Sequence, residues 1–155
     1  MNIKTSIIYA AILIAAFFAA SCSKMETPDS ESSDVMVLAS GHIYTNSQDN
    51  PQSIKGITLT LSAYPENGES SEPDFQTAIK TNKEGLYLIS LEYLPNYQYI
   101  LTAEDTDGSK NLGQFKSSKI KLNFSKSPEM NPETGLMTHF FWNIDFHLNA
   151  FTQQE

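Results

Sequence analysis

Apolar and polar residues alternate along most of the chain after residue 34, which is the pattern of strands with one buried face. The clearest alternations lie at residues 57–64, 119–124 and 140–149. Further strands are expected at residues 36–44, 77–81, 86–91 and 97–104. Turn-forming residues separate these segments, and no stretch after residue 34 shows a helical stripe. The sequence therefore predicts an all-β domain, a single antiparallel Greek-key β-sandwich of about seven strands.

The last alternation predicts one continuous strand over residues 140–149. Its inward side chains would be Phe140, Trp142, Ile144, Phe146 and Leu148. The opposite face would carry His139, Asp145 and His147, and alternate side chains on one face lie about 6.5 to 7 Å apart. Asp145 and His147 could hold zinc, but zinc needs three or four convergent ligands, so a solvated strand face is the preferred interpretation. Phe141 on this face would cover the sheet edge or contact a partner.

The N-terminal segment has a different composition. Lys4 precedes an apolar run over residues 7–20, which is shorter than the roughly 20 residues of a membrane-spanning helix and ends in small residues, as a cleavable signal does. The following Ala19-Ala20-Ser21-Cys22 resembles the lipobox of bacterial lipoproteins, with Ala19 where Leu is usual. The resemblance implies a signal peptide over residues 1–21 and lipidation of Cys22 by two acyl chains. Ordinary secretion with an incidental Cys22 is the alternative.

The lipobox resemblance also predicts the organisation and location of the chain. Residues 22–34 are rich in serine and acids, which is typical of a flexible tether. The sandwich would then span residues 35–150, and residues 151–155 would form a tail. Two or more acyl chains hold a protein firmly at a bilayer. Ser23 after the cysteine resembles the outer-membrane sorting default of Gram-negative lipoproteins, so we expect the protein at the outer membrane. The sequence leaves open whether the domain faces the periplasm or the cell surface.

Composition excludes several classes of function. The formal net charge of -8 argues against nucleic acid as a partner, because phosphate binding depends on Lys and Arg. All cationic residues are Lys, so no guanidinium fork is present for phosphate or carboxylate. The single cysteine excludes an internal disulfide framework.

Three segments resemble the carboxypeptidase-regulatory-like, or transthyretin-like, domains. They are residues 41–44, 53–61 and 81–88. In this pattern Gly56 would permit a close approach before the second strand, and Gly85 would supply a positive φ in a hairpin turn. Ser53 stands where Pro is frequent, and Asn82 stands where Asp is usual. The resemblance implies a transthyretin-like sandwich that acts as a non-catalytic module.

The segment Glu104-Asp105-Thr106-Asp107-Gly108 resembles the D-x-D-G segment of lipoproteins associated with radical-SAM maturases. This resemblance implies a maturase as a partner, with the chain as its substrate. Asp105, Asp107 and Asn111 could also offer oxygen ligands to calcium. An EF-hand loop needs Gly at its sixth position and Glu at its twelfth, whereas Gly108 is fourth and Lys116 twelfth here. An Asx-type turn is the preferred interpretation, and a calcium loop is the alternative.

The sequence shows no catalytic motif, neither G-x-S-x-G nor H-E-x-x-H nor a Gly-rich phosphate loop. Ser40 and His42 are two apart on one strand, which does not place a base beside a nucleophile. An acidic cluster in the loop over residues 65–75 is typical of a solvated tip; its members are Glu66, Glu69, Glu72 and Asp74. The chain is therefore predicted not to be an enzyme and to need no cofactor.

The predicted function is a lipid-anchored envelope protein that acts as a structural or binding module. Its partners would be the membrane, through Cys22, and an envelope protein or glycan. An anchored carbohydrate- or peptide-binding protein is the first alternative, and it requires exposed aromatics such as Tyr44, Tyr64 and Tyr93 to cluster on one surface. A maturase substrate is the second alternative.

Overall fold

The computed structural model describes residues 34–67 and 71–151, all within the second of the two units of the chain, Ser33–Glu155. The predicted signal peptide, Cys22 and nearly all of the tether lie outside the described residues, as do residues 152–155. Phe151, assigned to the tail from the sequence, still donates its backbone N–H to the Gln114 carbonyl at 2.8 Å.

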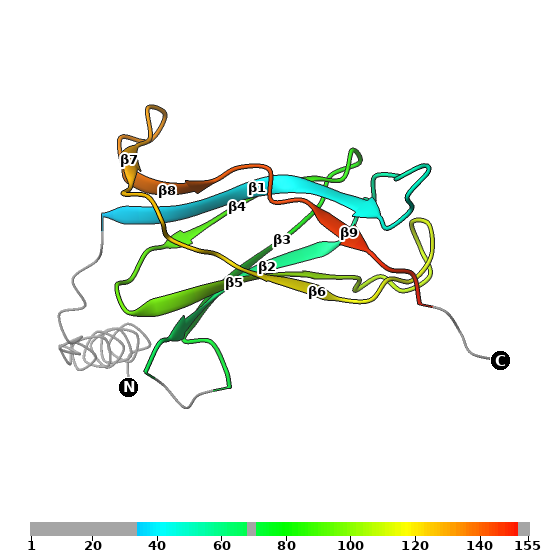
Figure 1. Cartoon of the computed structure of the whole chain (residues 1–155), viewed down its shortest axis with the longest axis horizontal. Helices are drawn as coiled ribbons and strands as arrows, with labels where there is room; N and C mark the ends of the chain where they lie inside the picture. The colour runs from blue at the N-terminus through cyan, green and yellow to red at the C-terminus, as the bar shows by residue number, and fades with distance from the viewer. Residues whose placement is uncertain (1–33, 68–70, 152–155) are drawn as a thin grey trace, which may run out of the picture. The chain divides into compact units, whose positions relative to one another are not determined.

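Nine strands form two sheets that pack face to face (Figure 1). The first sheet contains, in spatial order, β4 (Leu86–Glu92), β1 (Val35–Thr45), β8 (Met137–Phe141) and β7 (Glu129–Met130), and β1 also pairs with β9 (Phe146–Leu148). The second contains β3 (Phe75–Lys80), β2 (Thr58–Pro65), β5 (Tyr97–Glu104) and β6 (Ser118–Lys121). The described residues contain no helix, so the predicted all-β sandwich is confirmed.

The connections follow a Greek-key arrangement. Strands β2 and β3 pair, β4 joins the other sheet beside β1, and β5 returns to pair with β2. Two details of the prediction are wrong. The strand β1 pairs in parallel with β8 and β9, so the first sheet is mixed. The strand count is nine because residues 125–135 lead into the β7–β8 hairpin and because the predicted last strand is divided into β8 and β9.

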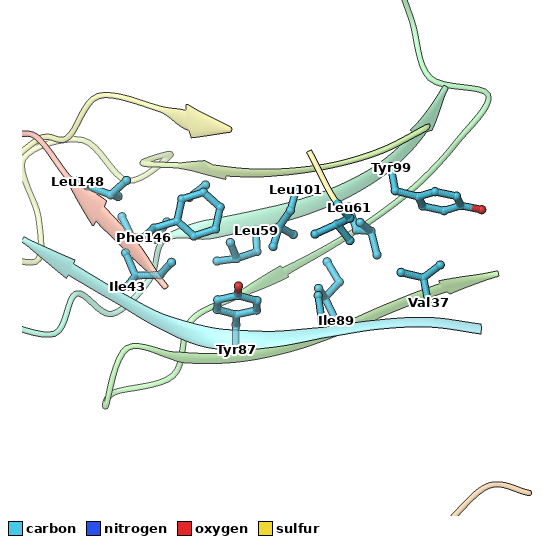
Figure 2. Close-up of a cluster of buried hydrophobic side chains, with 14 of the residues drawn as sticks. Val37, Ile43, Leu59, Leu61, Tyr87, Ile89, Tyr99, Leu101, Phe146 and Leu148 are labelled. Atoms are coloured by element: carbon cyan, nitrogen blue, oxygen red, sulfur yellow. The ribbon is translucent and has the colours of Figure 1, made fainter. Parts of the chain in front are cut away.

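The core lies between the inner faces of the two sheets, where Figure 2 shows their apolar side chains meeting. The alternation on β2 is confirmed, since Leu59, Leu61 and Ala63 are fully buried. The largest fully buried side chain, Tyr99, donates its hydroxyl to the Glu92 carbonyl at 2.8 Å and accepts the Leu94 backbone N–H at 2.7 Å. Both hydrogen bonds satisfy a phenol that burial would otherwise penalise, and that burial raises the pKa of Tyr99 to about 12.

The turn between β3 and β4 requires a glycine. Gly85 has a φ of 76°, and a Cβ there would lie 3.0 Å from the Ile43 carbonyl oxygen. The Asn82 side chain closes this turn by accepting the backbone N–H groups of Glu84 and Leu86. The positive φ predicted for Gly85 is confirmed, and the substitution of Asn for Asp at residue 82 keeps the same acceptor oxygen.

The chain breaks between β8 and β9. After the break the predicted faces are confirmed, since Phe146 and Leu148 are buried, whereas before the break they are reversed. Asn143 has a φ of 59°, which a continuous strand does not allow. As a result, His139 pairs in register with the buried Val37 and is itself only 9% exposed, whereas Trp142 is 56% exposed. Phe141 packs against the core instead of facing outward. The predicted orientations of these three side chains are therefore wrong.

Candidate functional site

A cleft of about 460 Å³ opens at the edge of the sandwich, between β8 and the segment that follows β6. Its apolar lining consists of Phe124, Phe140, Phe141, Trp142 and Ile144, and its polar lining of Asn123, Ser125, Lys126, Ser127, Glu129, Thr138 and His139. Ligand sites commonly have volumes of about 300 to 1,000 Å³ and combine apolar walls with a few polar groups. This cleft fits that description.

The floor of the cleft is a cluster of packed rings. The His139 ring centroid lies 4.6 Å from that of Tyr93 and 4.9 Å from that of Phe124. Phe141 meets Phe124 edge to face, with centroids 5.1 Å apart. Desolvation by these neighbours lowers the pKa of His139, and a hydrogen bond to the Lys126 backbone opposes that effect. The floor is therefore closely packed, and its imidazole favours the neutral form.

The lowered pKa of His139 predicts a loss of stability on acidification. Below about pH 6.5 the unfolded imidazole binds a proton more readily than the folded one, so protonation favours the unfolded state. The contribution of His139 is complete above pH 6.5 and declines as the pH falls toward its folded pKa. We expect His139→Phe to lose less stability than the wild type between pH 7 and pH 5 in urea unfolding. His147→Gln, at an exposed position, is the control, and equal pH dependence in His139→Phe and the wild type would contradict the prediction.

The rim of the cleft is formed by the single tryptophan of the chain. The indole of Trp142 stacks on the ring of Phe140 with centroids 5.1 Å apart and planes 14° apart. The backbone on both sides is fixed, since Phe141 pairs with Ala39 and Ile144 donates its N–H to the Ser40 carbonyl at 2.9 Å. Trp142 is thus a preorganised, largely exposed aromatic surface.

The part of the lining that follows β6 is polar. Asn123, Ser125 and Ser127 are exposed and bring one amide and two hydroxyl groups to the cleft. A turn holds this segment, because the Ser125 N–H donates to the Asn123 carbonyl at 3.0 Å. Lys126 and Glu129 contribute one charge of each sign, so the formal charges of the lining cancel.

Sequence reasoning missed this cleft because it placed Trp142 in the core. The reversal depends on Asn143, a residue type that adopts a positive φ more readily than most. The tolerance of Asn for a positive φ was the only sequence signal for a break in the strand, although Asn is also compatible with an exposed strand position. From the sequence, residues 123–127 are predicted to form the end of a strand and the start of a loop.

The three residues considered as zinc ligands, for which a solvated strand face was the preferred interpretation, are not brought together. His139 points into the core, whereas Asp145 and His147 are exposed. An Asp145 carboxylate oxygen accepts the His42 backbone N–H at 2.8 Å. Within residues 34–67 and 71–151, no group of three or more His, Cys, Asp or Glu side chains is arranged to hold a metal ion.

The loop proposed for calcium is closed by its own hydrogen bonds. One carboxylate oxygen of Asp105 accepts the Asp107 backbone N–H at 3.2 Å, and the other accepts the Phe115 N–H at 3.0 Å. The Asn111 side-chain amide donates to Asp107. The first of these contacts is an Asx turn, the preferred interpretation from the sequence. A Cβ on Gly56 would lie 3.0 Å from both Asp107 and Asn111, so the close approach predicted at Gly56 is to these side chains.

The tyrosines expected to form a glycan-binding surface are dispersed. Tyr44 stacks between His42 and His147, with ring centroids 5.3 and 5.5 Å away. Tyr93 packs in the core, and Tyr64 lies on β2 in the other sheet. This arrangement contradicts a glycan surface built from these three residues.

The remaining candidates form no catalytic arrangement. The ring of His42 stacks on Tyr44, which lies two residues further along the strand, whereas Ser40 lies two residues before His42. In the acidic cluster, Asp74 accepts the Tyr97 hydroxyl at 2.9 Å, and Glu69 lies outside the described residues.

Comparison with known proteins adds little to this description. No protein-family model matches the chain, and no curated protein does. Among solved structures, the chain is similar to the major plantain pollen allergen Pla l 1, with 16% identity and a TM-score of 0.42 over 77% of this chain and 98% of the allergen. The fold assignment above rests on the strand pairing alone. The described part of the chain contains no helix long and apolar enough to cross a membrane. Lipidation of Cys22 and the maturase association stay predictions from the sequence.

Proposed function

We propose that this chain is a lipid-anchored, non-enzymatic binding module of the envelope of a Gram-negative bacterium, which takes its ligand in the cleft beside β8. The single observation that carries the binding role is the exposed Trp142 in the lining of the cleft. A large aromatic side chain left 56% exposed and held from one side by Phe140 presents apolar area at little entropic cost.

The proposed anchoring rests on the sequence around Cys22. The described domain begins with β1 at Val35, so residues 22–34 would separate the lipid from the sandwich. A chain with that composition has too little apolar surface to fold by itself, which suits a tether.

The non-enzymatic character is supported by the chemistry of the cleft. His139 is the only histidine in its lining, and it packs among Tyr93 and Phe124 with a hydrogen bond to the Lys126 backbone. None of the hydrogen bonds described for the cleft places a nucleophilic side chain beside the His139 imidazole. The polar side chains of the cleft lining are suited to orienting a ligand.

The test uses Trp142 as its own reporter. Tryptophan emission should change saturably when the mature protein, in a detergent without a sugar headgroup, is titrated with oligosaccharides and peptides. Because this is the only tryptophan of the chain, the signal comes from the cleft. A ligand at 100 times its Kd should also raise the free energy of unfolding by about 2.7 kcal/mol. If neither library changes emission or melting temperature, the binding role is wrong.

A further inference from the structure

We infer that the ligand of the cleft is a neutral sugar ring that stacks on Trp142 and directs its hydroxyl groups toward Asn123, Ser125 and Ser127. This inference rests on the proposed binding function and specifies its ligand. It is carried by one flat aromatic surface and several small polar side chains that line the same cleft.

The two kinds of side chain in the lining match the two surfaces of a sugar. A pyranose presents C–H groups on its faces and hydroxyl groups around its edge. The indole of Trp142 offers an apolar face with negative electrostatic character, which attracts the slightly positive C–H groups. The amide of Asn123 and the hydroxyls of Ser125 and Ser127 both donate and accept hydrogen bonds, as sugar hydroxyls do.

The charge of the cleft favours a neutral ligand. Lys126 and Glu129 cancel formally, and the buried His139 adds no charge at neutral pH because its pKa is lowered. Without Arg in the chain, an acidic sugar would find no bidentate partner. The formal net charge of -8 would also repel anionic polymers.

The geometry disfavours an extended peptide in this cleft. Proline-rich peptides bind grooves between aromatic ridges. Here Phe124 and Phe141 pack edge to face with centroids 5.1 Å apart, so they form a closed floor and leave no groove between them. The Trp142–Phe140 pair is the one raised aromatic surface of the lining.

The experiment compares neutral disaccharides with their uronic-acid counterparts and with peptides, using the full mature protein in the same detergent. Calorimetry replaces fluorescence for the variants, because substitution of Trp142 removes the reporter. We expect saturable binding of at least one neutral disaccharide and weaker binding of its acidic counterpart. Trp142→Ala should weaken that binding roughly tenfold or more, and Trp142→Tyr should weaken it less.

Matched variants separate the cleft from the rest of the surface. Asn123→Ala should reduce affinity without changing the melting temperature of the free protein, since Asn123 is exposed. Phe75→Ala removes another exposed aromatic side chain, 48% exposed on the edge strand β3, and should leave affinity within about twofold.

The outcomes are distinguishable. Saturable binding of peptides but not of sugars would overturn the sugar assignment and leave the binding function standing. Tighter binding of acidic than of neutral sugars would overturn the charge argument and with it the inference. Absence of binding by every class would overturn both the inference and the proposed function.

Discussion

Gly41→Ala is expected to destabilise the domain by about 3 kcal/mol or more. A Cβ at residue 41 would lie 2.2 Å from the Ile144 carbonyl oxygen and 2.6 Å from its carbonyl carbon. Both atoms belong to the backbone, so no rotamer change can relieve the overlap. Residues 142–145, which connect β8 to β9, pass over β1 at Gly41. This connecting segment would have to move away to make room for the Cβ.

That movement would disrupt three hydrogen bonds that hold the segment between β8 and β9 in place. Ile144 donates its N–H to the Ser40 carbonyl at 2.9 Å, and its own carbonyl accepts the Tyr87 hydroxyl. The neighbouring Asp145 accepts the His42 N–H at 2.8 Å. Each such bond contributes about 1 kcal/mol. The same crossing positions Trp142, so Gly41→Ala should also weaken ligand binding.

Thermal unfolding measures this effect, with a fall in melting temperature of roughly 10 °C or more expected. Gly108→Ala is the control for steric overlap, because no atom lies within 4 Å of the added Cβ; unlike Gly41, Gly108 has a positive φ, 72°. It should cost only about 1 to 2 kcal/mol, through its left-handed conformation. Equal stability of the two variants would contradict the close approach at Gly41.

Cys22→Ala is expected to abolish lipid attachment completely. The predicted thioether and its acyl chains depend on one sulfur atom, and the sequence contains no second cysteine. Two acyl chains bind a bilayer stably, whereas a protein with none has no comparable anchor. Labelled palmitate should enter the wild-type chain and should not enter Cys22→Ala.

The mass of the mature N-terminus provides the second measurement. In the wild type, the first residue should be an acylated Cys22, and Ser23→Ala should leave this modification unchanged. An unlabelled wild-type chain, or a mature chain that begins at another residue, would contradict the anchoring proposal. Neither result would bear on the fold or on the cleft.

Local alternation predicted most of the fold correctly, since the side chains of a strand point to opposite faces with period two. Leu59 and Leu61 on β2 illustrate this, because their neighbours in sequence are polar and their own side chains are buried. The turn at Gly85 could also be predicted from the neighbouring residues alone. A left-handed φ there requires glycine whatever the rest of the chain does.

The same rule failed over residues 139–142, although it held for Phe146 and Leu148, because period two holds only while the strand is continuous. The break at Asn143 shifts the register by an odd number of positions, and such a shift moves each side chain to the other face. His139 consequently enters the core, and Trp142 leaves it. The candidate site therefore arises from the one element whose prediction was wrong.

By itself, the sequence determined the strand class, the positions of most strands and the inward residues of β2, β5 and β6, because these depend on neighbours a few residues apart. Only the tertiary structure decided that β1 pairs in parallel with β8 and β9, and that the chain turns between them over Gly41. Those choices depend on packing between residues about 100 positions apart, which local periodicity does not encode. The cleft beside Trp142 is a product of that long-range packing.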